Sequence, residues 1–280
     1  MPNLLTIQLM QRIKEPVLFC GDIHGHFDWV AQYIMKNDIN HCSMIICGDI
    51  GLGFSPIKKQ VQEMKKCGLA DCLKRQSVQL YLVRGNHDDP SLFDGRTLID
   101  RYVYTVKDYT VLKSEYHNIL CVGGGVSMDR ICRQADLDEQ ILSWLETHPE
   151  STRTKAMKHC SIGWWPDEYP VFNQEAIDNL DCKVDIVCSH TAPEAFLPIP
   201  LESSNWFKND SALKNDLIRE RHTMQQVLDR LILKKHPIAK WFFGHFHRYI
   251  SVSYNNLHYA LDYCCLDRAR DGNLCIKELL

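Results

Sequence analysis

The apolar run VLFCGD (residues 17–22) decides the fold class, because MIICGD (44–49) repeats its pattern of four apolar residues, a glycine and an aspartate. Short unbroken apolar runs are typical of strands that are buried on both faces of a parallel sheet. Four further runs have this character: VQLYLVRGNHDD (78–89), ILCVGGG (119–125), VDIVCSH (184–190) and WFFGHFH (241–247). We therefore expect a sheet of buried strands. The late pair YISVSY and LHYALDY, separated by two asparagines, predicts a β-hairpin.

Helical periodicity appears between these runs. One face is formed by Ile57, Val61, Met64, Gly68, Leu69 and Cys72, and a second by Leu217, Met224, Val227, Leu228 and Leu231. The basic residues of the second segment alternate with Glu220 and Asp229, which predicts a solvated face. Residues 126–183 carry no clear pattern, and 191–212 predict a long loop. Strands alternating with helices indicate one α/β domain over residues 1–280, with long loops on one rim.

The composition is that of an ordinary soluble globular protein, with 45% hydrophobic and 24% charged residues among 280. A net charge of −3 gives no general attraction to nucleic acid or to an anionic membrane, so we expect neither as a partner. No apolar run approaches the length of a membrane span. The first 16 residues lack the pattern of a secretory signal and are expected to belong to the mature protein. The sequence indicates no oligomeric state.

Thirteen cysteines are present, none of them in a Cys-x-x-Cys pair, which argues against a zinc knuckle or a thioredoxin-like motif. Cys20, Cys47, Cys121 and Cys188 lie inside apolar runs, as small buried hydrophobes do in a reducing compartment. We therefore expect a cytoplasmic protein.

Side chains that commonly bind metals follow five of the six predicted strands. They are Asp22, His24, Asp49, Asn86, His87, His190, His245 and His247. The carboxyl ends of strands in an α/β sheet share one edge, so these residues should converge there. On an extended chain His245 and His247 point to the same side. Such a pair is by itself more often a surface feature, but the other strand ends make it one edge of a predicted metal site.

Five motifs carry a resemblance to a known family: GDIHG (21–25), GD (48–49), GNHD (85–88), SHT (189–191) and GHFH (244–247). In this order they resemble the calcineurin-like metallophosphoesterase superfamily, over residues 20–247. The resemblance implies two mixed β-sheets in a sandwich flanked by helices, a four-layer α/β fold. GGGVSMDR (123–130) and GWWPDE (163–168) also resemble an uncharacterised bacterial and phage branch, which carries no established substrate.

The family pattern implies two divalent metal ions. One would be bound by Asp22, His24, Asp49 and His247, and the other by Asp49, Asn86, His190 and His245, so that Asp49 bridges them. Imidazole ligands favour Mn²⁺, which we expect, or Fe, Zn or Ni, over Ca²⁺ or Mg²⁺. Two ions about 4 Å apart can share a hydroxide and hold both the attacking and the leaving oxygen during displacement at phosphorus.

His87 resembles the family histidine near the leaving group, which implies a general acid; the alternative is a histidine that merely packs beside the cluster. Asp88 and Asp89 are candidates for its orienting partner. In the protein Ser/Thr phosphatase branch an Asp and an Arg stand at the positions of Leu52 and Gly53, which argues against that branch.

A substitute phosphate ligand is predicted at Arg130, with Arg84 as the alternative.

The resemblance implies a metal-dependent phosphoesterase that hydrolyses a phosphomonoester by attack of a metal-bridging hydroxide. The alternatives are a phosphodiesterase acting on a nucleotide or cyclic nucleotide, and a non-catalytic scaffold of the same fold. A duplex nuclease is not expected, because its surface should be basic.

Overall fold

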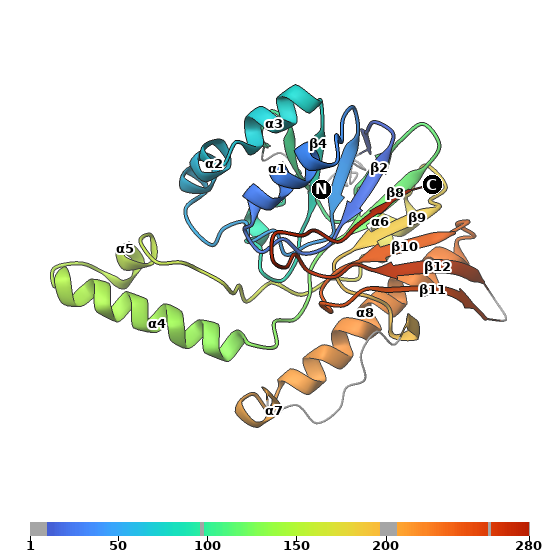
Figure 1. Ribbon diagram of the computed structural model, residues 1–280. Coiled ribbons are helices and arrows are strands. Elements are labelled where there is room, and N and C mark those ends of the chain that lie inside the picture. Colours follow the sequence, from blue (N-terminus) through green and yellow to red (C-terminus); the bar gives the residue numbers. More distant parts are fainter. Residues whose placement is uncertain (1–9, 96–97, 197–205, 257–258, 280) are drawn as a thin grey trace, which may run out of the picture.

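Two mixed β-sheets form the centre of the protein in the computed structural model, which describes residues 10–95, 98–196, 206–256 and 259–279 (Figure 1). Within these residues, the seven-stranded sheet has the order β1 (Met10–Arg12), β7 (Val111–Lys113), β8 (Asn118–Val122), β9 (Ile186–Ser189), β10 (Lys240–Phe243), β12 (Ala260–Cys265) and β11 (Ile250–Asn255). The six-stranded sheet, again within the described residues, has the order β13 (Ile276–Glu278), β2 (Val17–Cys20), β3 (Ser43–Ile46), β4 (Gln79–Val83), β6 (Val103–Val106) and β5 (Leu98–Asp100). The central strands β2–β3–β4 and β8–β9–β10 are parallel.

Helices connect and cover these strands. They are α1 (Phe27–Lys36), α2 (Ile57–Lys66), α3 (Leu69–Gln76), α4 (Arg130–Thr147), α5 (Arg153–Met157), α6 (Gln174–Asp178), α7 (Trp206–Asn209) and α8 (Leu213–Leu233), with short 3₁₀ turns η1 (Pro90–Leu92) and η2 (Glu194–Phe196). Helices α1, α2 and α3 pack on the outer face of the six-stranded sheet, and α6 and α8 on that of the other. The predicted four-layer sandwich is confirmed.

Alternation along each strand divides the core into layers. In β2, Leu18 and Cys20 face the helices, whereas Val17 and Phe19 face the other sheet. Phe19 stacks on Phe242 of β10 with 3.9 Å between ring centroids, which closes the space between the two sheets. Apolar side chains on both faces explain why these strands appear in the sequence as unbroken hydrophobic runs.

All six apolar runs contain the predicted strands, and each strand ends before the polar residues that follow it. The predicted hairpin is confirmed as the antiparallel pair β11–β12, although the turn residues 257–258 lie outside the described residues. The first nine residues of the N-terminal stretch also lie outside them.

Two helix predictions need correction. The periodic segment from Ile57 to Cys72 is two helices, α2 and α3, because Gly68 adopts a left-handed conformation (φ +81°) between them. The second periodic segment is α8, but its polar face is not uniformly solvated: Glu220 and Arg221 are buried. In the predicted loop 191–212, the described residues include η2 and α7, and 197–205 lie outside the described residues.

Helices α4 and α5 extend away from the two sheets as an arm, residues 130–157 (Figure 1). A small apolar cluster of its own, around Ile141, Ala156 and Cys160, holds the two helices together. The unpatterned region 126–183 therefore contains the arm and α6.

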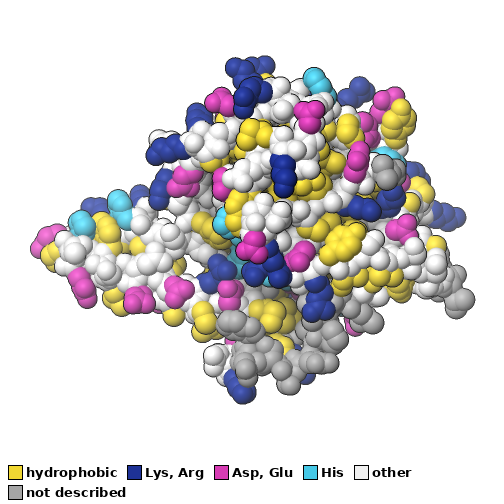
Figure 2. All heavy atoms as spheres, in the orientation of Figure 1, with side chains coloured by type: hydrophobic (Ala, Val, Ile, Leu, Met, Phe, Trp, Pro, Cys, Tyr) yellow, Lys and Arg dark blue, Asp and Glu magenta, His cyan; other side chains and the backbone are white. Residues whose placement is uncertain are grey.

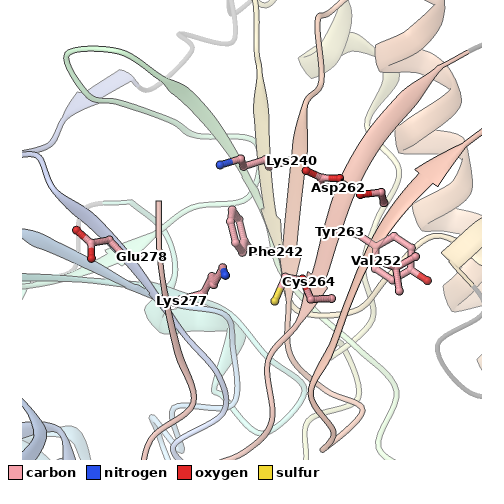
Figure 3. A pocket seen from close by; sticks show the side chains of 10 residues that line it. Lys240, Phe242, Val252, Asp262, Tyr263, Cys264, Lys277 and Glu278 are labelled. Carbon is pink, nitrogen blue, oxygen red and sulfur yellow. Dashed lines mark hydrogen bonds between the residues drawn. The ribbon is translucent and has the colours of Figure 1, made fainter. Parts of the chain in front are cut away.

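A cavity of about 270 Å³ opens between β13 and the strands β10, β11 and β12 (Figure 3). Its lining includes Lys240, the first residue of β10, so it lies toward the amino end of that strand. In the described part of the chain, no helix is long and apolar enough to cross a membrane.

Candidate metal centre

The strand ends bring the predicted ligands together. Asp22 follows β2, Asp49 follows β3, Asn86 follows β4, His190 follows β9 and His245 follows β10. Because these strands lie parallel within the two sheets, their carboxyl ends meet at one edge of the sandwich. In Figure 2, histidine side chains are visible near the middle of the face, where the arm joins the body.

Four of the predicted ligands have a left-handed backbone, which non-glycine residues rarely adopt. The φ angles are +45° at His24, +49° at Asp49, +67° at His245 and +50° at His247. Sharp turns of this kind direct successive side chains toward one point, and such strain is found mainly where the surrounding structure enforces it.

The first cluster consists of Asp22, His24, Asp49 and His247. One ligand atom from each of them lies within 4.8 Å of the others. The Nε2 atoms of His24 and His247 are 3.3 Å apart, and Nε2 of His247 is 3.4 Å from Oδ2 of Asp22. Both oxygens of Asp22 accept the backbone N–H of His245, at 3.2 and 3.1 Å, which fixes the carboxylate relative to the β10 loop.

The second cluster forms around His190, which is fully buried. Its Nδ1 donates to the carbonyl oxygen of Cys47 at 2.8 Å, so Nε2 is left to face the site. Nε2 lies 2.8 Å from Oδ1 of Asn86 and 3.2 Å from Oδ1 of Asp49. The rings of His190 and His245 have centroids 4.9 Å apart.

Asp49 belongs to both clusters, and its charge dominates the electrostatics. Burial raises its pKa, but the imidazoles of His190, His87 and His24 hold the pKa well below its usual range. Burial likewise lowers the pKa of His190, but Asp49 and Asp22 raise it to about 10. The carboxylates that raise this pKa would also stabilise a cation at the same position.

The donor chemistry fits two divalent transition metals. Carboxylates that are buried with imidazoles and one amide oxygen form the ligand set preferred by Mn²⁺, Fe, Zn or Ni. Each cluster holds a nitrogen-rich set of donors next to the buried Asp49 carboxylate, and the hydrogen bond from His190 to Cys47 is the kind of outer contact that orients a metal-binding imidazole.

His87 lies beside the cluster, with Nε2 3.9 Å from Oδ2 of Asp49. Its Nδ1 is 3.2 Å from the carbonyl oxygen of Gly163, so an Nδ1–H that donates there turns Nε2 toward the site. Neither candidate partner is in contact with the ring: Asp88 accepts the backbone N–H groups of Ile50, Leu52 and Gly85, and Asp89 caps η1. The orienting group is the backbone carbonyl of Gly163, so the acidic side chains that follow His87 in the sequence did not indicate it.

Comparison with known proteins identifies the family, because the model of the calcineurin-like phosphoesterase family matches residues 15–249. The chain belongs to the calcineurin-like phosphoesterase family. This family uses a dinuclear divalent metal centre.

Two known proteins are similar to this chain. The serine/threonine-protein phosphatase PP1-1 of Saccharomyces cerevisiae is 28% identical over 137 residues, which cover 42% of this chain and 41% of the yeast protein. The chain thus spans less than half the length of that relative. A dimetal phosphatase from Danio rerio resembles the structure with a TM-score of 0.42 and 14% identity, over 91% of this chain and 88% of the other.

The loop after β3 leaves little space for a side chain at Gly53. Gly53 has φ +102°, and a Cβ atom there would lie 2.5 Å from Cβ of Asp89 and 3.1 Å from the ring of Trp165. An arginine therefore has no room at this position unless the neighbouring segments move.

Arg130, the predicted phosphate ligand, has other partners. Its guanidinium group donates to Asp210 (2.5 and 3.1 Å), to Asp216 (2.8 Å) and to the hydroxyl of Tyr169 (2.8 Å). The side chain is buried, and most of its donors are used. The alternative, Arg84, donates to backbone carbonyls at 168 and 169 and to Asp108. These contacts argue against a phosphate-binding role for either arginine.

Three residues near the site were not predicted. Ser127 is buried and accepts a hydrogen bond from Asn86, and it donates in turn to the buried Glu168. Glu220 accepts the Val126 N–H and the Thr191 hydroxyl. One of its oxygens lies 3.7 Å from Nε2 of His245. Burial raises the pKa of Glu168 to about 8 and that of Glu220 to about 7. The only sequence signal was that Ser127 and Glu168 lie in the two motifs that resemble the uncharacterised branch, GGGVSMDR and GWWPDE.

Proposed function

We propose that this protein hydrolyses phosphomonoesters at a centre of two divalent metal ions, with Mn²⁺ as the preferred metal. The observation that carries the proposal is the position of Asp49 between two clusters, with Oδ1 3.2 Å from His190 and Oδ2 4.0 Å from His24. The first ion would be held by Asp22, His24, Asp49 and His247, and the second by Asp49, Asn86, His190 and His245. When bound, such ions polarise the phosphoryl group and lower the pKa of water.

The chain's own groups would complete the reaction. Nε2 of His87 faces the site because Nδ1–H is held by the Gly163 carbonyl, so the imidazolium form would give its Nε2 proton to a leaving oxygen. Arg130 is not part of this proposal, since its guanidinium is occupied by two carboxylates.

A phosphomonoester as substrate is supported by the similarity to a serine/threonine-protein phosphatase, although that similarity covers only part of both chains. The crowded position of Gly53 speaks for a different pocket from that of the protein phosphatases. We further propose that residues 1–280 act as one domain. A cytoplasmic location is supported by the thirteen cysteines, all of which are free thiols.

A substrate panel with added Mn²⁺ tests the proposal. It compares p-nitrophenyl phosphate, bis-p-nitrophenyl phosphate, mononucleotides and cyclic nucleotides. We expect higher kcat/KM on the monoesters. Preference for the bis ester or for a cyclic nucleotide would instead establish a phosphodiesterase, and absence of turnover with Mn²⁺, Fe²⁺, Zn²⁺ or Ni²⁺ would establish a scaffold.

A further inference from the structure

The sequence motifs GGGVSMDR (123–130) and GWWPDE (163–168) meet beside the second ligand cluster. Ser127, from GGGVSMDR, makes two hydrogen bonds to the carboxyl group of Glu168, from GWWPDE. Its backbone N–H donates to Oε1 at 2.8 Å, and its hydroxyl to Oε2 at 2.6 Å. The exposed fraction is 1% for Ser127 and 0% for Glu168, so water does not compete for these bonds.

Asn86 continues this chain of hydrogen bonds. Its Nδ2 donates to Oγ of Ser127 at 2.8 Å, and its Oδ1 points the other way, 2.8 Å from Nε2 of His190. Burial raises the pKa of the Glu168 carboxyl group to about 8, so above that pH the group is ionised and only accepts hydrogen bonds. A hydroxyl has a single proton. With that proton directed to Glu168, Oγ of Ser127 can only accept from Asn86. The carboxylate therefore sets which end of the amide faces the ligand cluster.

Contacts of its backbone carbonyl fix Glu168 beside the end of β4. Its carbonyl oxygen accepts from Nη1 of Arg84 at 2.8 Å and from the N–H of Gly125 at 3.0 Å. Gly124 permits this approach: its φ is +95°, and a Cβ atom there would lie 2.7 Å from the same carbonyl oxygen. Residues 84–86, 124–127 and 168 thus form one rigid support, which gives the glycine run and Arg84 a physical role.

We propose that Glu168 and Ser127 are positioning residues for the second metal site. They hold the Asn86 amide so that its oxygen, rather than its nitrogen, faces the metal. The inference rests on the proposed function only for the role of Asn86 as a ligand, and it concerns binding rather than turnover. With the hydroxyl removed, the amide can rotate. With a neutral amide in place of Glu168, Ser127 can accept from that amide and donate to Asn86, which would turn the amide nitrogen of Asn86 toward the metal.

Mn²⁺ binding to the metal-free full-length protein tests this directly when it is measured above pH 8, where Glu168 is ionised. Calorimetry gives the two affinities, and electron paramagnetic resonance distinguishes a spin-coupled pair from a mononuclear ion. The variants are Ser127→Ala and Glu168→Gln, with Asn86→Ala as the reference for loss of the ligand. Asp210→Asn is the matched control, because Asp210 is a buried carboxylate that pairs with Arg130 and contacts none of the proposed ligands.

We expect the second Mn²⁺ to bind about 10–100-fold more weakly in Ser127→Ala and in Glu168→Gln, with the first affinity unchanged. At one equivalent per site their spectra should show the mononuclear signal, whereas the control should show the coupled pair. If Glu168→Gln does not fold, Ser127→Ala alone decides.

Wild-type affinity at the second site in Ser127→Ala, or in a folded Glu168→Gln, would overturn the proposal, as would an equal loss at both sites. A wild-type protein that binds two Mn²⁺ ions but hydrolyses no ester would refute the proposed function and leave this inference intact.

Discussion

Asp49 and His190 form a buried ion pair, with Oδ1 and Nε2 3.2 Å apart, at the point where β3 and β9 end. The second oxygen of Asp49 faces away from His190, toward His24 at 4.0 Å and His87 at 3.9 Å. A single carboxylate thus connects two groups of ligands, each of which contains residues from both sheets. Its negative charge is the feature on which a two-metal centre depends.

Asp49→Asn should be the most damaging change among the proposed ligands. It keeps the shape of the side chain but removes the charge that holds two cations close together. We expect kcat to fall below that of His24→Ala and of His247→Ala, each of which weakens one site. Metal analysis by mass spectrometry accompanies the kinetics. An Asp49→Asn protein with both metals and most of its rate would refute the bridging role.

His87→Ala separates proton transfer from metal binding. Loss of a general acid should lower kcat by about 10²–10⁴-fold on alkyl phosphates, whose alkoxide leaving groups need a proton. The loss should be smaller on p-nitrophenyl phosphate, because its phenolate departs readily without one.

The metal content of His87→Ala is the control. If both metals are retained and the two substrates lose rate equally, His87 is not the acid. If a metal is lost, the histidine supports the metal site instead.

Arg130→Met should affect stability rather than substrate binding. Removing the guanidinium leaves the Asp210 and Asp216 carboxylates without their partner, and breaking a buried pair in this way costs about 3–5 kcal/mol of unfolding free energy. KM for p-nitrophenyl phosphate should stay at the wild-type value. A raised KM at unchanged stability would instead support Arg130 as a phosphate ligand.

The ion pair of Arg130 and Asp210 makes the free energy of unfolding depend on pH. The hydrogen bond from Arg130 lowers the pKa of Asp210 below its ordinary value of 3.8, so the folded state gains stability above that value and loses it as the pH falls through the lowered pKa. Urea unfolding at a series of pH values should therefore show the deficit of Arg130→Met to be full at pH 7 and to shrink below about pH 4. A deficit that stays constant into acid would show that ionisation of Asp210 is not involved.

The central strands and the seven proposed ligands could be predicted because each signal is local. A strand buried on both faces is an unbroken apolar run, and its polar successor lies at the sheet edge whatever the rest of the chain does. The positions of His190 and Asn86 at the sheet edge followed from this pattern alone. The helix break at Gly68 was missed because glycine also fits an apolar face, and only its left-handed φ ends the helix.

The supporting residues depend on contacts between distant segments. Ser127 and Glu168 are 41 residues apart and meet only because the arm leaves and returns at the site. Arg130 acquires its partners from residues 210 and 216, across a segment that the sequence indicated only as a loop. Glu220 lies on the same face of α8 as the buried Leu217 and Met224, but its charge assigned it to the solvated face in the sequence analysis, so its burial was missed.

The most direct test of the central claim is the rate of p-nitrophenyl phosphate hydrolysis as Mn²⁺ is added stepwise to the metal-free protein. If two ions share Asp49, the rate should follow the concentration of protein with both metal sites filled. It should level off at two Mn²⁺ ions per chain. A rate that levels off after one equivalent, or that stays at the metal-free background throughout, would contradict a dinuclear phosphoesterase.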